Sequence, residues 1–326
     1  MKICIYGAGA IGGYLGAKLA RTDADVSLVA RGPHLTAIRK GGLTLIEAGQ
    51  SHTQQITATD TPATLGVQDY VIVTLKAHSI PAIVSQMQPL LGPETTVVFA
   101  VNGVPWWYFY GLDGKFADHH LKTVDPGGEI WNGIGPERAL GCVVYPACEV
   151  IKPGVVAHKS GNRFSLGEPD GTRSARAQTL SALMVTAGLK APVRPRLRDE
   201  IWLKLWGNAS LNPISALTGL TLKQMLENPE TSCIINDIMA ELKVVGEALG
   251  ARFGVSVEKR MAGAAAVGEH KTSMLQDLEA GREMEIDALV SAVKELAILA
   301  DCPTPTLDRV LAQVVQKARA AGCYPN

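Results

Sequence analysis

The sequence predicts an α/β protein in which an N-terminal doubly wound sheet precedes a second, all-α domain. Short apolar runs alternate with helical patterns through the first third of the chain, which is typical of a sheet built from strand and helix pairs. Beyond residue 171, apolar residues recur at steps of three and four, as in helices. The length of 326 residues exceeds the usual size of one domain. We therefore expect two domains, covering residues 1–170 and 171–326.

The N-terminal domain begins with apolar segments that have the composition of strands buried on both faces. We expect them at 2–6, 25–30, 70–75 and 95–101. Helical segments are expected between them, at 14–21 and 80–91. This repetition predicts a parallel sheet covered by helices on both faces. Further extended segments should complete the sheet and include antiparallel pairs, at 143–146, 154–158 and 163–166.

The C-terminal domain should consist of helices at 174–187, 199–209, 234–249, 286–300 and 307–320. Within the N-terminal domain, the stretch 105–139 fits neither a helical nor a strand period, and loops of this length are usually functional or mobile. It carries Trp106, Trp107 and Phe109. Such aromatic side chains bury much area, so they suit packing within a domain or a homodimer contact at least as well as substrate contact.

The balance of charge and the cysteine pattern exclude several classes of protein. Lys plus Arg and Asp plus Glu both total 31, which argues against nucleic acid or an anionic membrane as a partner. The six cysteines are scattered, with no CxxC pair and no spacing typical of metal ligands, which suits reduced thiols in the cytoplasm. Glycines interrupt the apolar run in residues 1–20, and no window resembles a membrane span. We expect a soluble, cytoplasmic protein without a metal site.

The first turn of the chain carries a glycine motif in the context that dinucleotide binding requires. Its residues follow the strand 2–6 and open a helix: Gly7, Ala8, Gly9, Ala10, Ile11 and Gly12. The glycines allow a tight turn and a close approach of a pyrophosphate to the backbone, and the helix N-terminus faces the phosphate charge. This motif predicts a Rossmann-type nucleotide-binding domain.

The end of the second strand indicates which nucleotide is bound. An NAD site usually has Asp or Glu there, whereas this strand ends in Arg31, which can bind a 2′-phosphate and favours NADP(H). Two later strands end near Lys76 and Asn102, at the sheet edge where ligands of such folds bind. Lys76 could meet a phosphate, and Asn102 could meet ribose, nicotinamide or substrate. The alternative for each of these three side chains is that of a solvated surface residue.

A polar row in the second domain suggests a substrate site. Lys204, Asn208 and Asn212 are spaced by four and share one helix face, at least until Pro213 disturbs the register. The row is either a solvated surface or a set of donors for a carbonyl and a carboxylate. Glu285 lies near the start of a later helix, where the helix dipole alone would favour a carboxylate.

Taken in order, these motifs resemble the ketopantoate reductase family, the 2-dehydropantoate 2-reductases, over essentially the whole chain. The resemblance implies that NADPH reduces a 2-oxo acid while its nicotinamide lies between the two domains. It implies that Lys204 is the general acid, that Asn208, Asn212 and Ser273 bind substrate, and that the cofactor is bound by the glycine turn together with Arg31, Lys76, Asn102, Ala147 and Glu285.

The chemistry of a ketone reductase suits Lys204. Hydride transfer to a ketone carbon leaves negative charge on the oxygen, and an ammonium within hydrogen-bond reach stabilises that charge and supplies the proton. Burial would lower the pKa of such an amine and a neighbouring carboxylate such as Glu285 would raise it.

Two positions depart from the family pattern. Leu222 lies in the stretch Thr218–Leu222, where the family often has a substrate-facing Asn, and His270 replaces another Asn. His270 could replace the amide, titrate, or be solvated. The substrate pocket is therefore altered, and three functions stay open. They are formation of pantoate for pantothenate and coenzyme A synthesis, reduction of another 2-oxo acid, and NADP(H) sensing without turnover.

Overall fold

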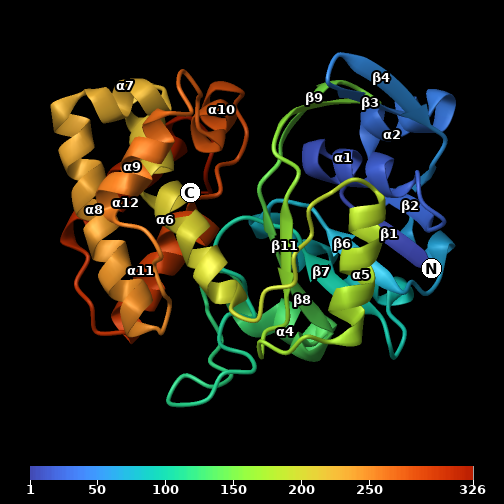
Figure 1. The fold of residues 1–326 in the computed structure, drawn as a ribbon, viewed down its shortest axis with the longest axis horizontal. Helices are drawn as coiled ribbons and strands as arrows, with labels where there is room; N and C mark the ends of the chain where they lie inside the picture. Colours follow the sequence, from blue (N-terminus) through green and yellow to red (C-terminus); the bar gives the residue numbers. More distant parts are fainter. Residues whose placement is uncertain (326) are drawn as a thin grey trace. The chain divides into compact units, whose positions relative to one another are not determined.

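The computed structural model describes residues 1–325, which form two compact units (Figure 1). Unit 1 comprises Met1–Val101 and Pro105–Leu197. Unit 2 comprises Asn102–Val104 and the residues from Arg198 onward. The segment 171–197, expected in the second domain, therefore joins unit 1, while three residues from the middle of the N-terminal half join unit 2.

The main sheet of unit 1 has seven strands in the order β11-β8-β7-β6-β1-β2-β5. All pairs are parallel except β8 with β11, which are antiparallel. The strands are β1 (Lys2–Tyr6), β2 (Asp25–Val29), β5 (Thr57–Thr59), β6 (Tyr70–Val73), β7 (Thr96–Phe99), β8 (Ala139–Val144) and β11 (Phe164–Gly167). The predicted fold class is confirmed, because the apolar runs of the sequence form the central strands.

A second sheet of four strands, in the order β4-β3-β10-β9, was not predicted. Its strands are β3 (Leu43–Glu47), β4 (Gln50–Gln54), β9 (Ala147–Lys152) and β10 (Val155–Ser160). The prediction that residues 154–158 complete the main sheet is wrong, since β10 pairs with β3 and β9. Polarity explains the omission, because β4 is almost wholly exposed and shows no apolar period.

Helix α1 (Ala10–Leu19) packs against strands of both sheets. Two of its glycines make this possible. A Cβ on Gly16 would lie 2.7 Å from Leu28 of the main sheet, and a Cβ on Gly13 would lie 2.7 Å from Val156 of the second sheet. The helix begins at Ala10, four residues earlier than the predicted 14–21 and within the glycine motif 7–12.

The other helices of unit 1 are short. They are α2 (Gly32–Gly41), α3 (Val84–Met87), α4 (Glu129–Ile134) and α5 (Ala175–Thr186), and six 3₁₀ turns are present at Pro62–Leu65, Ala77–Ser79, Pro81–Ile83, Gln88–Leu90, Pro126–Gly128 and Pro136–Arg138. The expected helix 80–91 is therefore broken into 3₁₀ turns around α3. Pro81 and Pro89 account for the breaks, because proline has no N–H to donate.

The aromatic stretch after residue 104 is packed within unit 1. Trp106, Trp107, Tyr108 and Phe109 are each at most 3% exposed. The ring of Trp106 contacts Phe99 of β7 edge-on, with 5.3 Å between ring centroids. Of the roles considered for these side chains, packing within a domain is the one observed, and their burial removes them as a surface for a dimer contact.

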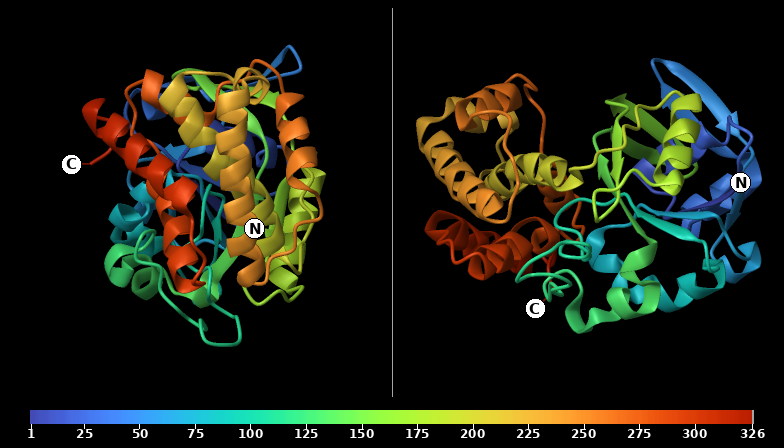
Figure 2. Two further views of the ribbon diagram at one scale, coloured as in Figure 1. Left: turned by 90° about the vertical axis from the view of Figure 1, so that its left-hand side faces the viewer. Right: turned by 60° about the horizontal axis from the view of Figure 1, so that its bottom comes forward.

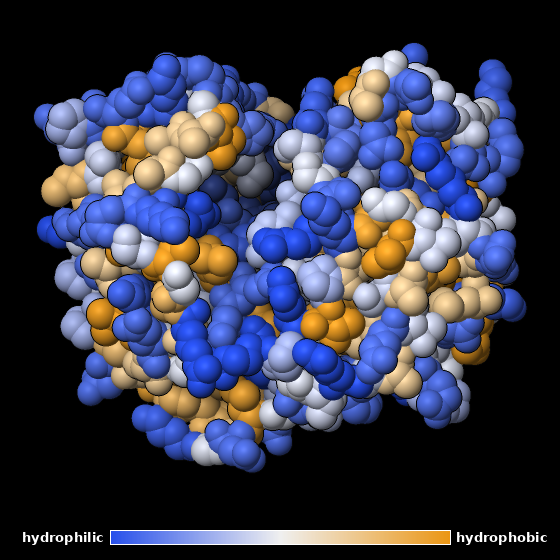
Figure 3. Space-filling view, viewed as in Figure 1, coloured by the Kyte–Doolittle hydropathy of each residue, from blue (hydrophilic) through white to orange (hydrophobic). Residues whose placement is uncertain are grey.

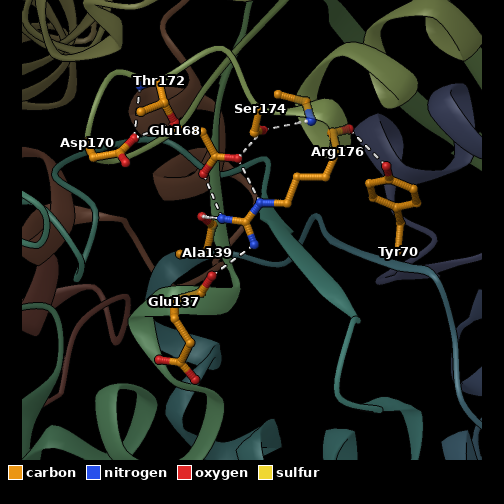
Figure 4. A network of polar contacts seen from close by, with 9 residues as sticks. Tyr70, Glu137, Ala139, Glu168, Asp170, Thr172, Ser174 and Arg176 are labelled. Atoms are coloured by element: carbon orange, nitrogen blue, oxygen red, sulfur yellow. Dashed lines mark hydrogen bonds and ion pairs between the residues drawn. The ribbon is translucent and has the colours of Figure 1, made fainter.

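An ion pair explains why the segment after residue 170 belongs to unit 1 (Figure 4). Glu168 is 4% exposed at the side chain and accepts two hydrogen bonds from Arg176, from Nε at 2.7 Å and from Nη2 at 2.6 Å. Arg176 also donates to the carbonyl of Glu137 at 2.8 Å, and its own carbonyl accepts from the hydroxyl of Tyr70. These bonds fix the start of α5 against the strands.

Unit 2 is helical over the residues described, apart from its connecting turns (Figure 2). Its helices are α6 (Leu197–Thr218), α7 (Leu222–Glu227), α8 (Pro229–Ala248), α9 (Val257–Ala265), α10 (Ser273–Glu279), a π-helix (Asp287–Ser291), α11 (Ala292–Leu299) and α12 (Pro305–Ala320). Trp202 and Trp206 of α6 are fully buried, and the indole N–H of Trp206 donates to the carbonyl of Met239 at 2.7 Å. Helix α6 is thus packed into the core of this unit.

The surface seen in Figure 3 mixes polar and apolar residues, with apolar ones in small scattered patches. Among residues 1–325, no helix combines the length and the apolar composition that crossing a bilayer demands.

Candidate active site

The glycine turn of unit 1 is held by the backbone of the neighbouring strand. The N–H groups of Gly7 and Ala8 both donate to the carbonyl of Val29, at 3.1 and 3.0 Å. Gly7 has φ +107°, a conformation that residues with a Cβ rarely adopt. The turn is therefore fixed to the end of β2, two residues before Arg31.

Gly12 is enclosed on the inner side of the turn. A Cβ on Gly12 would lie 2.1 Å from the carbonyl oxygen of Gly7 and 2.4 Å from Oγ1 of Thr74. That hydroxyl donates to the Gly7 carbonyl at 2.6 Å. Thr74 was not identified from the sequence, although its place directly after β6, two residues before Lys76, was a signal that could have found it.

Gly9 lies on the open side of the same turn. A Cβ built on Gly9 would have no atom within 4 Å, and Gly9 is the N-cap of α1, where no side chain caps the first turn. The turn thus presents an uncrowded backbone and the N-terminus of a ten-residue helix. Such a cradle fits a pyrophosphate, because the helix N-terminus offers N–H groups and favourable charge.

The other proposed cofactor residues of unit 1 follow nearby elements. Arg31 is exposed and is the N-cap of α2, and Lys76 is half-buried and extended at the start of a 3₁₀ turn. Ala147 is the first residue of β9 and is half-buried. Arg31 follows the carboxyl end of β2 and Lys76 follows that of β6, the two strands that flank β1 in the parallel sheet.

The polar row of unit 2 lies on one uninterrupted helix. Helix α6 continues through Pro213, so Lys204, Asn208 and Asn212 keep their spacing of four and share a face. Lys204 and Asn208 are half-buried, while Asn212 is 5% exposed. The row is therefore partly enclosed rather than a fully solvated surface.

Lys204 contacts a residue 102 positions earlier in the chain. Its Nζ donates to Oδ1 of Asn102 at 2.5 Å. This bond lies within unit 2, because the segment Asn102–Val104 packs there. It gives the ammonium a defined position on the polar face of α6.

A π-helix holds the Asn102 segment in place. The N–H of Val104 donates to the carbonyl of Ala288 at 2.8 Å, and Gly103, with φ +93°, lies so close that a Cβ would be 2.3 Å from the same oxygen. Ala288 belongs to the π-helix Asp287–Ser291, and π-helices often occur at functional sites. Gly103 and Ala288 are positioning residues that the sequence patterns did not reveal.

The remaining proposed residues lie on the same unit. Ser273 is exposed at the first position of α10, and Glu285 is half-buried two residues before the π-helix. The two positions that depart from the family pattern are bonded to each other, because the N–H of Leu222 donates to the carbonyl of His270 at 3.0 Å. The His270 side chain is exposed, whereas Leu222 is buried.

Fold and site together define the class of this protein as an NAD(P)-dependent oxidoreductase. The chain belongs to the ketopantoate reductase family. Residues 3–171 match the model of the ketopantoate reductase PanE/ApbA domain, and residues 196–318 match that of its C-terminal domain. The two matches together include both sets of proposed site residues.

Full-length relatives support the same assignment. A 2-dehydropantoate 2-reductase from Mesorhizobium japonicum is 56% identical over 99% of this chain and 100% of its own length. A crystal structure described as a ketopantoate reductase from Ralstonia solanacearum superimposes with a TM-score of 0.95, at 42% identity over 99% of both chains. D-mandelate dehydrogenase, solved with NADH and anilino(oxo)acetate, has a TM-score of 0.83 at 20% identity, covering 98% of this chain and 99% of its own, and shares the fold.

Proposed function

We propose that this protein reduces 2-dehydropantoate to pantoate, with NADPH as the reductant. The observation that carries the proposal is the hydrogen bond from Lys204 to Asn102 on a half-buried polar helix face. A fixed ammonium can donate a hydrogen bond to a ketone oxygen and stabilise the charge that develops there. The relative from Mesorhizobium japonicum carries the same activity in its name.

In this reaction NADPH, when bound, supplies a hydride to the ketone carbon. Lys204 transfers a proton to the ketone oxygen and regains it from solvent, so that the ketone becomes an alcohol. Asn102 accepts a hydrogen bond from the ammonium and orients it. Asn208 and Asn212, one and two turns along α6, supply amides to the substrate, and Ser273 supplies a hydroxyl.

The residues proposed to hold the cofactor are those of the glycine turn together with the side chains and backbone groups named next. The backbone of the glycine turn, from Gly7 to Gly12, binds the pyrophosphate, and Arg31 with Lys76 binds the 2′-phosphate. Ala147 contributes a backbone contact, and Glu285 with Asn102 binds the ribose and nicotinamide end. The choice of NADPH over NADH rests on Arg31, because a guanidinium matches a phosphate bidentately.

The cofactor assignment is tested by Arg31→Ala. Loss of the phosphate contact should raise the KM for NADPH by roughly 10-fold or more, since charged hydrogen bonds contribute about 1.5–3 kcal/mol, and leave the KM for NADH nearly unchanged. Arg39→Ala, which removes another exposed arginine of the same helix, is the control. An unchanged preference in Arg31→Ala would remove Arg31 from the site.

A second 2-oxo acid is the competing substrate, because Leu222 occupies a position where the family often has an amide. An apolar side chain there suits a different substituent, and replacement of one amide can change selectivity strongly. NADPH oxidation should be followed with 2-dehydropantoate and a panel of other 2-oxo acids. Preferred turnover of 2-dehydropantoate supports the proposal, and turnover of another acid alone supports the competitor. NADPH binding without any turnover would leave a sensor.

A further inference from the structure

An arginine from a different helix lies against α6, next to the turn that carries Lys204. The guanidinium of Arg260 lies against Gly207, where a Cβ would be 2.1 Å from Nη2 and 3.0 Å from Cζ. Gly207 is three residues after Lys204 and directly before Asn208. Residues three apart on a helix are surface neighbours, so this guanidinium lies beside the Lys204 turn of the row.

Glycine at 207 is what permits this approach. Any side chain there would occupy the position of the guanidinium. A glycine inside a 22-residue helix costs about 1 kcal/mol relative to alanine, so its presence calls for a packing reason. The contact with Arg260 supplies one.

The segment before Arg260 fixes its position, through an aromatic contact of Phe253 and a helix cap at Ser256. Phe253 packs its ring on Trp206 and Trp202 of α6, with centroid distances of 4.8 and 6.4 Å. Ser256 then caps α9, and the N–H of Arg260 donates to the Ser256 carbonyl at 3.0 Å in the first turn. The aromatic contact and the cap together fix α9 against α6.

The chemistry of the substrate calls for a second cation. A 2-oxo acid presents two oxygen-bearing groups on adjacent carbons, a ketone and a carboxylate. Lys204 serves the ketone, while a carboxylate in a partly enclosed site needs a countercharge. Arginine has five N–H donors in a planar fork that matches a carboxylate. A guanidinium that bonds a protein group along one edge therefore still has N–H donors along its other edge for a ligand.

We infer that Arg260 binds the carboxylate of the 2-oxo acid and thereby sets the preference for acids over neutral ketones. This inference rests on the proposed function. It assigns the polar face of α6 two cations with separate tasks. Lys204 protonates the ketone oxygen, and Arg260 positions the substrate through its carboxylate.

The test compares Arg260→Met with wild type on 2-dehydropantoate and on its methyl ester, which has the same ketone without the charge. We expect kcat/KM for the acid to fall by roughly 10- to 100-fold, the range for loss of charged hydrogen bonds, while kcat/KM for the ester changes less than about 3-fold. Lys259→Met removes an exposed neighbouring charge of α9 and should leave both values unchanged.

Gly207→Ala provides an independent variant that keeps the arginine. Its Cβ should displace the guanidinium and reproduce the loss for the acid, although alanine favours the helix. In an Arg260→Met background, the same glycine substitution should have little further effect. Unchanged circular dichroism and Tm would show that both variants are folded.

Binding without turnover separates this inference from the proposed function. Calorimetry of the acid with the protein and NADP⁺, which carries no hydride, should show weaker binding to Arg260→Met. Equal binding and equal kinetics in wild type and Arg260→Met would overturn the role of Arg260 while leaving the proposed function intact. If wild type does not turn over 2-dehydropantoate, the proposed function fails, and Arg260 is judged on whichever 2-oxo acid wild type reduces. If wild type neither reduces nor binds any 2-oxo acid, the proposed function and the role of Arg260 both fail.

Discussion

Lys204 on α6 and Asn102, 102 residues earlier, are joined by a hydrogen bond of 2.5 Å. The Asn102 amide fixes the position of the Lys204 ammonium. The Asn102 segment is itself held by the hydrogen bond from the N–H of Val104 to the carbonyl of Ala288. Asn102→Ala should therefore lower kcat by roughly 10-fold or more by releasing the general acid from its position. Steady-state kinetics measure this effect. Asn132→Ala, an exposed asparagine of α4, is the matched control, and an equal kcat in all three proteins would contradict the positioning role.

Gly9 and Gly12 should respond differently to the same substitution. Gly9→Ala meets open space and should leave Tm unchanged while raising the Kd for NADPH by roughly 10-fold, because its methyl group would occupy the backbone's approach to the pyrophosphate. Gly12→Ala would collide with the Gly7 carbonyl and Thr74, and should lower Tm as well. Gly41→Ala, also in open space in unit 1, is the control. Normal NADPH binding by Gly9→Ala would argue against the proposed pyrophosphate site.

The Glu168 and Arg176 pair should contribute measurably to stability. Glu168→Gln removes the charge of a carboxylate that is 4% exposed, and Arg176 is 30% exposed, so the cost should be about 2–3 kcal/mol, below that of a fully buried pair. Glu149→Gln breaks an exposed pair with Lys159 and should cost less than about 1 kcal/mol. Urea denaturation of both variants gives the comparison. Equal losses would mean that the buried pair does not stabilise unit 1 in this way.

Protonation of His34 should lower the stability of the fold in mild acid. Burial lowers the pKa of His34, and its Nδ1 accepts a hydrogen bond from the N–H of Gly154 at 3.1 Å, which requires an unprotonated nitrogen. The unfolded chain therefore binds the proton more readily, and stability falls as the pH drops below about 6.5, the ordinary value for histidine. His34→Asn keeps an acceptor but cannot titrate, so Tm should depend less on pH between 7 and 5. A parallel decline in both proteins would exclude this histidine as the cause.

Much of the fold was predictable because its determinants are local. Buried strands such as β1 and β6 are continuous apolar runs, and the glycine turn follows one of them directly. The second sheet was not predictable, since β4 is polar and exposed and β3 also pairs with β10, which lies far along the chain. Pairing between segments distant in sequence has no local signature.

The candidate site likewise has a part that follows from local sequence and a part that depends on contacts between distant segments. The spacing of Lys204, Asn208 and Asn212 is a helical pattern, and it was visible in the sequence. Asn102 and Lys204 are 102 residues apart in the sequence, and Gly207 and Arg260 are 53 residues apart. Only the tertiary structure brings them together. The one local signal was Gly207 itself, a glycine inside a helix.

We propose that Lys204 supplies the proton for reduction of 2-dehydropantoate. This role is tested by kcat of Lys204→Met at saturating NADPH and 2-dehydropantoate, with Lys243→Met, which removes a lysine of α8, as control. We predict that kcat falls by roughly 10²-fold or more, the usual weight of acid catalysis, while the Kd for NADPH and the control's kcat stay near wild type. A kcat of Lys204→Met close to that of wild type would show that Lys204 is not the general acid.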